Sequence, residues 1–143
     1  MKRVTILLAL LAFACASAPP SDEDAAVAVV KQYYRAIASH DFTQAYHLWV
    51  GGAPPDQSFE DFVSGFRQTA TVAVETGSPS RVGAAAGSRY IDIPVVVNAT
   101  TTSGARQRFE GTYTLQRAVA DGATAEQRKW HLYRASLRPT PAP

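Results

Sequence analysis

The sequence contains only one cysteine, Cys15, among its 143 residues. A chain with one cysteine forms no internal disulfide, so the stability of its fold must come from a hydrophobic core. Histidines are also few, and His40, His47 and His131 show no HExxH or comparable ligand spacing. A glycine-rich phosphate loop and a GxSxG nucleophile motif are both missing. No metal and no cofactor is therefore predicted.

The chain also lacks an excess of either charge. It has 14 basic and 12 acidic residues, and loss of Lys2 and Arg3 with an N-terminal signal leaves 14 − 2 = 12 basic residues against 12 acidic ones. Nucleic-acid binding needs a concentrated positive surface that displaces counterions from phosphates. A nucleic-acid partner is therefore not expected. Six Phe, six Tyr and two Trp supply enough bulky material for one folded core.

The N-terminal apolar run is too short to cross a bilayer, which takes about 20 residues as a helix. Residues 4–13 form this run, between Lys2-Arg3 and a small-residue cleavage site, and this pattern is typical of a secretory signal. We therefore predict a signal over 1–16, a linker over 17–23, one domain over 24–138 and a flexible proline-rich tail over 139–143.

Cys15 leaves two interpretations of the signal open. The segment 11–15 resembles the lipobox of bacterial lipoproteins, in which Cys15 becomes the lipidated N-terminus. Alternatively, Cys15 is a signal residue that is lost when cleavage follows Ala16. In both cases the domain is expected outside the cytoplasm, in the periplasm or anchored to the outer membrane, with the lipid anchor as its only contact with a membrane.

Three helices are predicted in the first half of the chain, each begun by a capping residue. Ser21, Asp41 and Ser58 each precede a segment whose apolar residues recur at helical spacing. The first helix is expected to end near Ser39. The apolar faces are Val27, Val30, Tyr34 and Ile37 in the first helix, Phe42, Ala45, Tyr46 and Trp49 in the second, and Phe59, Phe62, Val63 and Phe66 in the third.

Strands follow, because the apolar period changes to two from Thr69 onward. They are predicted over 69–76, 90–98, 106–119 and 129–137, and the stretch 81–86 is either a short strand or a link. Pro94 lies inside the second of the long strands and has no N–H to donate, which predicts an edge strand or a bulge there. The prolines of 139–143 predict that the sheet ends before them. Helices followed by a meander of strands indicate an α+β fold with the helices on one face of an antiparallel sheet.

Two stretches of the sequence resemble a known superfamily. They are the helical pair 29–37 and 41–49 (VVKQYYRAI and DFTQAYHLW) and the strand pair 109–117 and 130–137 (FEGTYTLQR and WHLYRASL). Together they resemble the nuclear-transport-factor-2-like (NTF2-like, SnoaL-like or cystatin-like) superfamily over about residues 24–138. The resemblance implies three N-terminal helices packed on a curved sheet that forms a cone with an apolar cavity. It also implies a homodimer that pairs through the sheet. The superfamily includes both enzymes and exported domains without a known reaction, so the resemblance assigns no activity.

Candidate chemistry is sparse. Asp92, His131 and Tyr133 are weak catalytic candidates, because strands can place all three on one face of the sheet, where Asp92 would orient His131 for proton transfer. Tyr34 and Tyr46 are candidates for lining a ligand pocket with hydroxyl groups, although aromatic residues on amphipathic helices are usually core. His40 and Asp41 are adjacent in sequence, and Asp41 is interpreted as a helix cap and not as half of a catalytic pair.

These observations favour a non-catalytic exported binding or interaction domain of the bacterial cell envelope. Its expected partner is a small apolar ligand or an envelope protein. The alternative hypothesis is a cavity enzyme of the isomerase, cyclase or dehydratase type that uses Asp92, His131 and a tyrosine. The two hypotheses differ in what they require of the structure, because the enzyme needs these side chains to converge in a pocket.

Overall fold

The computed structural model describes residues 18–143. The predicted signal and Cys15 lie outside these residues. In the described part of the chain, no helix combines the length and the apolar character that crossing a membrane requires.

Between residue 18 and the middle of the chain, three α-helices form, and each begins at the predicted cap. They are α1 (Asp22–Ala38), α2 (Phe42–His47) and α3 (Phe59–Gly65), with a short 3-10 turn η1 (Val50–Gly52) after α2. The side chains of Ser21, Asp41 and Ser58 accept hydrogen bonds from backbone N–H groups three residues further on. The capping predictions are therefore confirmed. Because α1 begins at Asp22, the segment predicted as a linker over 17–23 ends at Ser21.

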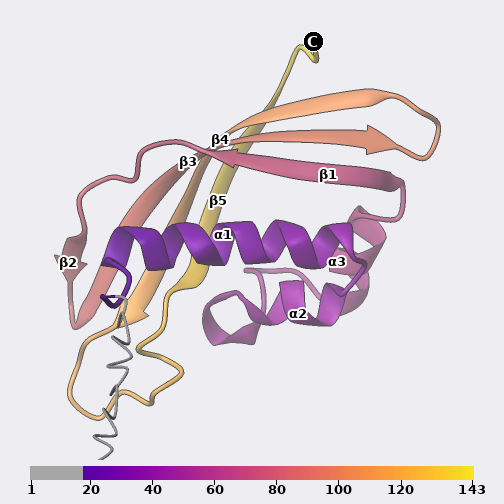
Figure 1. Cartoon of the computed structure of the whole chain (residues 1–143). Helices are drawn as coiled ribbons and strands as arrows, with labels where there is room; N and C mark the ends of the chain where they lie inside the picture. Colours follow the sequence, from indigo (N-terminus) through magenta and orange to yellow (C-terminus); the bar gives the residue numbers. More distant parts are fainter. Residues whose placement is uncertain (1–17) are drawn as a thin grey trace, which may run out of the picture.

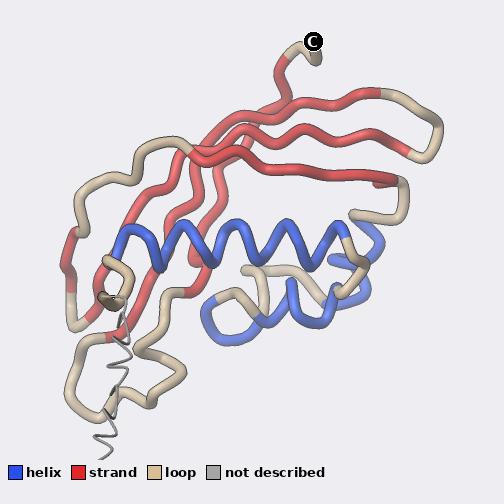
Figure 2. The backbone as a smooth tube through the Cα atoms, viewed as in Figure 1, coloured by secondary structure: helices blue, strands red, loops and turns tan. Residues whose placement is uncertain are grey.

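Five strands follow and form one antiparallel sheet: β1 (Thr69–Thr76), β2 (Gly83–Ala85), β3 (Ser88–Thr101), β4 (Arg106–Ala118) and β5 (His131–Thr140). The order is β1-β3-β4-β5, and the short β2 pairs with the beginning of β3. All three helices lie on one face, with α1 running along the sheet beneath β1 (Figures 1 and 2). The predicted α+β class, with three helices packed on a curved antiparallel sheet, is confirmed.

The prediction from Pro94 is wrong, because β3 is a central strand with β1 on one side and β4 on the other. Pro94 pairs with Thr112 of β4 without a bulge. On the other side β1 ends opposite Val95, and the Pro94 carbonyl accepts from the N–H of Gly77, the residue after β1. In an antiparallel strand the N–H and C=O of one residue point to the same side. The missing N–H therefore faces the place where β1 has ended, and no bond to β4 is lost.

The prolines at the C-terminus also behave differently from the prediction. β5 continues to Thr140, so the tail predicted over 139–143 begins later, and Pro139 pairs with Phe109 of β4. Sheets tolerate proline on an edge strand, where one side of the backbone has no partner. Because β5 is an edge strand along this stretch, Pro139 does not stop it.

Gly111 allows the backbones of β4 and β5 to approach each other closely. It pairs with Leu137, and a Cβ atom at position 111 would clash with the backbone carbonyl oxygen of Ser136. Any other residue would push the two strands apart. The sheet curves around α1 (Figure 1).

Candidate functional site

Aromatic rings from the helices and the sheet fill the interior of the cone. Tyr33 lies at their centre, with its ring centroid 5.1 Å from that of Tyr34, 6.1 Å from Trp49 and 6.0 Å from Tyr113. Phe62 closes the group from α3, with its centroid 6.3 Å from that of Tyr33. All five side chains are buried. Where the resemblance implies an apolar cavity, this chain places its own aromatic core.

A hydrogen bond between two tyrosine hydroxyls lies inside this core. The hydroxyl oxygens of Tyr34 and Tyr113 are 2.8 Å apart, and the two residues are 6% and 3% exposed. Burial raises the pKa of Tyr34 to about 12 and that of Tyr113 well above its usual value of 10.0. Both phenols therefore stay neutral at physiological pH. Each hydroxyl serves as the other's partner, so the pair satisfies two polar groups that burial removes from water.

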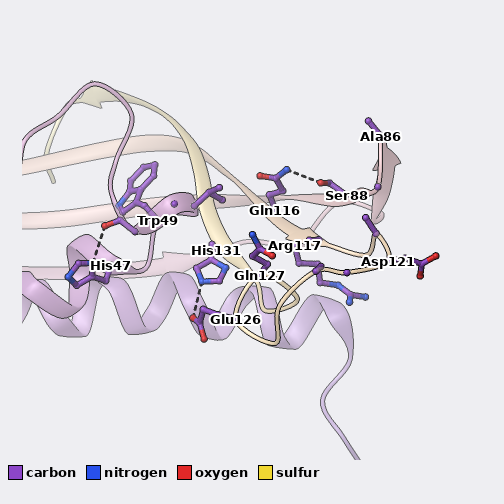
Figure 3. A pocket seen from close by; sticks show the side chains of 18 residues that line it. His47, Trp49, Ala86, Ser88, Gln116, Arg117, Asp121, Glu126, Gln127 and His131 are labelled. Carbon is purple, nitrogen blue, oxygen red and sulfur yellow. Dashed lines mark hydrogen bonds and ion pairs between the residues drawn. The ribbon is translucent and has the colours of Figure 1, made fainter.

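A large opening lies elsewhere, at the end of the sheet where β4 finishes and β5 begins. This opening, called the end groove here, has a volume of about 750 Å³. Its walls come from η1, the turn at Ala86-Gly87, the end of β4 and the loop 120–127 (Figure 3). The polar side chains that line it include His47, Ser88, Gln116, Arg117, Asp121, Glu126, Gln127 and His131.

The side chains of His131 and Glu126 are within hydrogen-bond distance in the end groove. The Nε2 atom of His131 lies 3.1 Å from Oε1 of Glu126, and its Nδ1 atom lies 3.0 Å from the backbone oxygen of Lys129. Both partners are hydrogen-bond acceptors. A ring with a single N–H can therefore donate to only one of them at a time. The hydrogen bond from the Lys129 ammonium, followed by that from His131, holds the pKa of Glu126 below its usual value of 4.5. Glu126 is therefore an acceptor for His131 at neutral pH.

Gln116 lies next to His131 in the lining of the end groove. Its Nε2 atom donates to the hydroxyls of Ser88 at 3.0 Å and Tyr90 at 2.9 Å. Within residues 18–143 its side-chain carbonyl oxygen accepts no hydrogen bond. Gln116 also pairs with His131 across β4 and β5. The end groove therefore presents a free amide acceptor beside an imidazole that is already oriented.

A second cleft, of about 430 Å³, shares Arg117, Glu126 and His131 with the end groove. It lies between the first turns of α1 and the segment 126–131. Nη2 of Arg117 donates to Asp22 at 2.8 Å, and its guanidinium carbon lies 5.4 Å from the centre of the Trp130 ring. These contacts tie the start of α1 to the inner face of β4.

The structure does not bring the predicted catalytic residues together. Asp92 is on β3 and His131 on β5, with β4 between them. The carboxylate of Asp92 accepts from Thr114 at 2.6 Å, and His131 pairs with Glu126 instead. Tyr133 packs its ring against that of Tyr90 at 5.5 Å. Of the three candidates, only His131 lines the end groove.

The two tyrosines predicted to line a pocket have different surroundings. Tyr34 points its hydroxyl into the core but also borders a groove of about 300 Å³ between α1 and β1. Tyr46 donates from its hydroxyl to the backbone oxygen of Gln57 at 2.8 Å and packs against Phe59. Asp41 caps α2, as predicted, and does not contact His40 through its carboxylate.

Sequence reasoning missed Glu126 and Gln116. Glu126 lies in a loop with no periodicity, and its distance of five residues from His131 indicates no pairing by itself. Gln116 did not stand out, because it is one of several polar residues on an alternating strand. Among residues 18–143 no group of three or more His, Cys, Asp or Glu side chains is placed to hold a metal ion.

Comparisons by sequence found no matching family model and no matching curated protein. Comparison by structure found similar folds, among them two crystal structures. The crystal structure of a "Putative Scytalone Dehydratase" from Novosphingobium aromaticivorans aligns with a TM-score of 0.56 and 12% identity, over 80% of this chain and 82% of that one. The Kfla4162 protein from Kribbella flavida aligns with a TM-score of 0.54 and 14% identity, over 83% and 90%. At such identities the likeness shows the fold, which for this chain is the NTF2-like cone that the sequence resemblance implied.

Proposed function

We propose that this chain is an exported, non-catalytic binding domain whose ligand occupies the end groove. The observation that carries the proposal is the contrast between two possible ligand sites, the interior of the cone and the end groove. The interior of the cone is occupied by buried aromatic rings, whereas the end groove is open and has a volume of about 750 Å³. A volume of this size suits a small organic molecule.

The lining of the end groove indicates an amphipathic ligand. Apart from Trp49, its apolar wall consists of small side chains, so a flat apolar moiety can approach the backbone closely. Gln116 offers a free acceptor beside the imidazole of His131, and Arg117 adds a positive charge to the lining. A few convergent polar groups in a mostly apolar site orient a ligand and give specificity. The small residues of the apolar wall are Val50, Ala86, Ala118, Ala120 and Ala123.

Native mass spectrometry of the protein purified from its own cell envelope tests this proposal. We expect a bound small molecule that dissociates on denaturation. An Ala120→Trp variant fills part of the end groove and is expected to lose that molecule, while Ala105→Trp, which adds the same bulk at an exposed position outside the groove, is expected to keep it. Retention of the molecule by Ala120→Trp would contradict the assignment of the groove.

A cavity enzyme is the alternative, and one observation favours it. His131 is paired with a carboxylate in an open groove, which is the arrangement that proton transfer needs. One of the similar folds is described as a putative dehydratase, although at 12% identity. The His131→Gln variant separates the two functions. A binding domain keeps its affinity within a few fold, whereas an enzyme keeps its substrate affinity and loses turnover by about 10²-fold or more.

We further propose that the chain is made with an N-terminal signal that is removed before Cys15, so that Cys15 becomes the lipidated N-terminus. Two features of the sequence support this: the basic and apolar N-terminus, and the position of the only cysteine at the end of the apolar run. Mass spectrometry of the mature N-terminus after membrane fractionation tests it. We expect an acylated Cys15, and loss of both the acyl mass and the membrane fraction in Cys15→Ser. An unmodified terminus at Ser17 would make the domain a free periplasmic protein.

A further inference from the structure

The two edges of the sheet differ in how well they are protected against pairing with another chain. The β5 edge carries Arg134, Arg138 and Pro139, and Trp49 already bridges it at Leu132. Charged residues and proline on an edge are the usual devices that prevent strand addition. The β5 edge is therefore closed by its sequence and by a neighbouring segment.

The β1 edge has almost none of these devices. Its eight residues, TATVAVET, include no Lys, Arg or Pro, and its one charge, Glu75, is 3.4 Å from the amide nitrogen of Asn98 on β3. β1 pairs only with β3. Within residues 18–143, Ala70–Thr76 form no hydrogen bond to any segment other than β3. A long edge with little charge and with free N–H and C=O groups is a template for an added strand. β1 is visible along the open side of the sheet in Figure 1.

A small groove runs beside this edge and carries positive charge. The edge groove is formed by Val72, Ala73 and Val74 of β1 and by one side of α1, with a volume of about 300 Å³. Lys31 and Arg35 are exposed at its rim, and no acidic side chain lines it. An added strand would therefore lie with one of its faces against two cations.

The spacing of the two cations fits an extended chain. Lys31 and Arg35 are four residues apart on α1, which corresponds to about 6 Å along the helix axis. Residues i and i+2 of a strand point to the same face and are about 7 Å apart. Acidic side chains at alternate positions of an added strand thus match the two cations one to one. A second copy of this chain fits poorly, because two-fold pairing of β1 with β1 would bring the cations of both copies together.

We propose that the β1 edge binds an extended acidic segment of a partner protein by strand addition, with Lys31 and Arg35 contacting alternate carboxylates. The backbone of β1 supplies the hydrogen bonds, and the two cations set the preference for acidic sequences. This surface is separate from the end groove. Failure of the edge proposal would therefore leave the ligand proposal standing, and the reverse also holds.

Fluorescence anisotropy with labelled peptides tests the proposal on the mature protein. The probe is a ten-residue peptide that alternates Glu and Val, and the comparison peptides replace Glu by Lys or methylate the backbone nitrogens. We expect the Glu peptide to bind at least about tenfold more tightly than either comparison peptide. The double variant Lys31→Glu/Arg35→Glu is expected to reverse the preference in favour of the Lys peptide, and Arg134→Glu/Arg138→Glu, an equal change of charge on the β5 edge, to leave it unchanged.

Hydrogen exchange identifies the strand that binds. Bound Glu peptide is expected to protect backbone amides within 70–76 from exchange. If the charge reversal unfolds α1, the variant Lys31→Gln/Arg35→Gln removes both positive charges without adding repulsion and provides the same test. No binding of the Glu peptide, or equal affinity for Glu and Lys peptides, overturns the proposal. So does protection of 70–76 in a dimer without peptide, which would make a second copy the occupant. Binding to anionic phosphatidylglycerol vesicles through Lys31 and Arg35, without peptide binding, would overturn it in favour of a membrane surface.

Discussion

The buried hydrogen bond between Tyr34 and Tyr113 gives the sharpest test of the interior as a structural core. Replacing either residue by Phe removes one hydroxyl and leaves the other buried without a partner, 6% or 3% exposed. Such a loss costs about 1–3 kcal/mol of the free energy of unfolding. Replacing both removes two polar groups together, which is nearly neutral. The two single changes are therefore expected to be non-additive, with a coupling free energy of about 2 kcal/mol or more.

Urea unfolding of the wild type, both single variants and the double variant measures this coupling. With a slope of roughly 2 kcal/mol per molar urea, each single change lowers the midpoint by about 0.5–1.5 M, and the double variant lies close to the wild type. Additive losses would refute the reasoning, because they would show that the two hydroxyls do not depend on each other. A single variant more stable than the wild type would indicate stored strain, which is typical of functional residues and not of core.

Two further changes test the fold. Gly111→Ala is expected to lower the free energy of unfolding by about 2 kcal/mol or more, because the new Cβ meets the Ser136 carbonyl; Gly65→Ala, where nothing lies within 4 Å, should have little effect in the same urea titration. Stability should also fall as pH rises above 10, because burial raises the pKa of Tyr34 to about 12 and the unfolded chain loses its phenolic protons first. Phenolate absorbance at 295 nm checks this, and ionisation of all six tyrosines near pH 10 in folded protein would contradict it.

Most of the fold follows from local signals in the sequence. Ser21, Asp41 and Ser58 start helices because their side chains satisfy backbone N–H groups within three residues, and no distant contact is needed. The change of apolar period at Thr69 reflects alternating burial on β1, β3 and β4, which is also local. Features of this kind can be predicted before any tertiary contact is known.

Strand order and the site depend on contacts that the sequence does not display. Pro94 wrongly indicated an edge strand. A central strand tolerates this proline because a different strand, β1, ends before it reaches Pro94. Pro139 continues β5 only because that strand lies at an edge. The pairing of His131 with Glu126, in place of Asp92, depends on the path of an irregular loop. Each outcome was decided by tertiary packing.

The most direct test of the binding function is an amide chemical-shift map of the mature, isotope-labelled protein titrated with a library of small amphipathic fragments. The end groove predicts shifts that cluster at Gln116, Ala118, Ala123 and His131, with those of the buried core unchanged. Shifts centred on Tyr33, Ile93 and Tyr113 would instead show that ligands enter the interior of the cone, and would contradict the assignment of the end groove as the binding site.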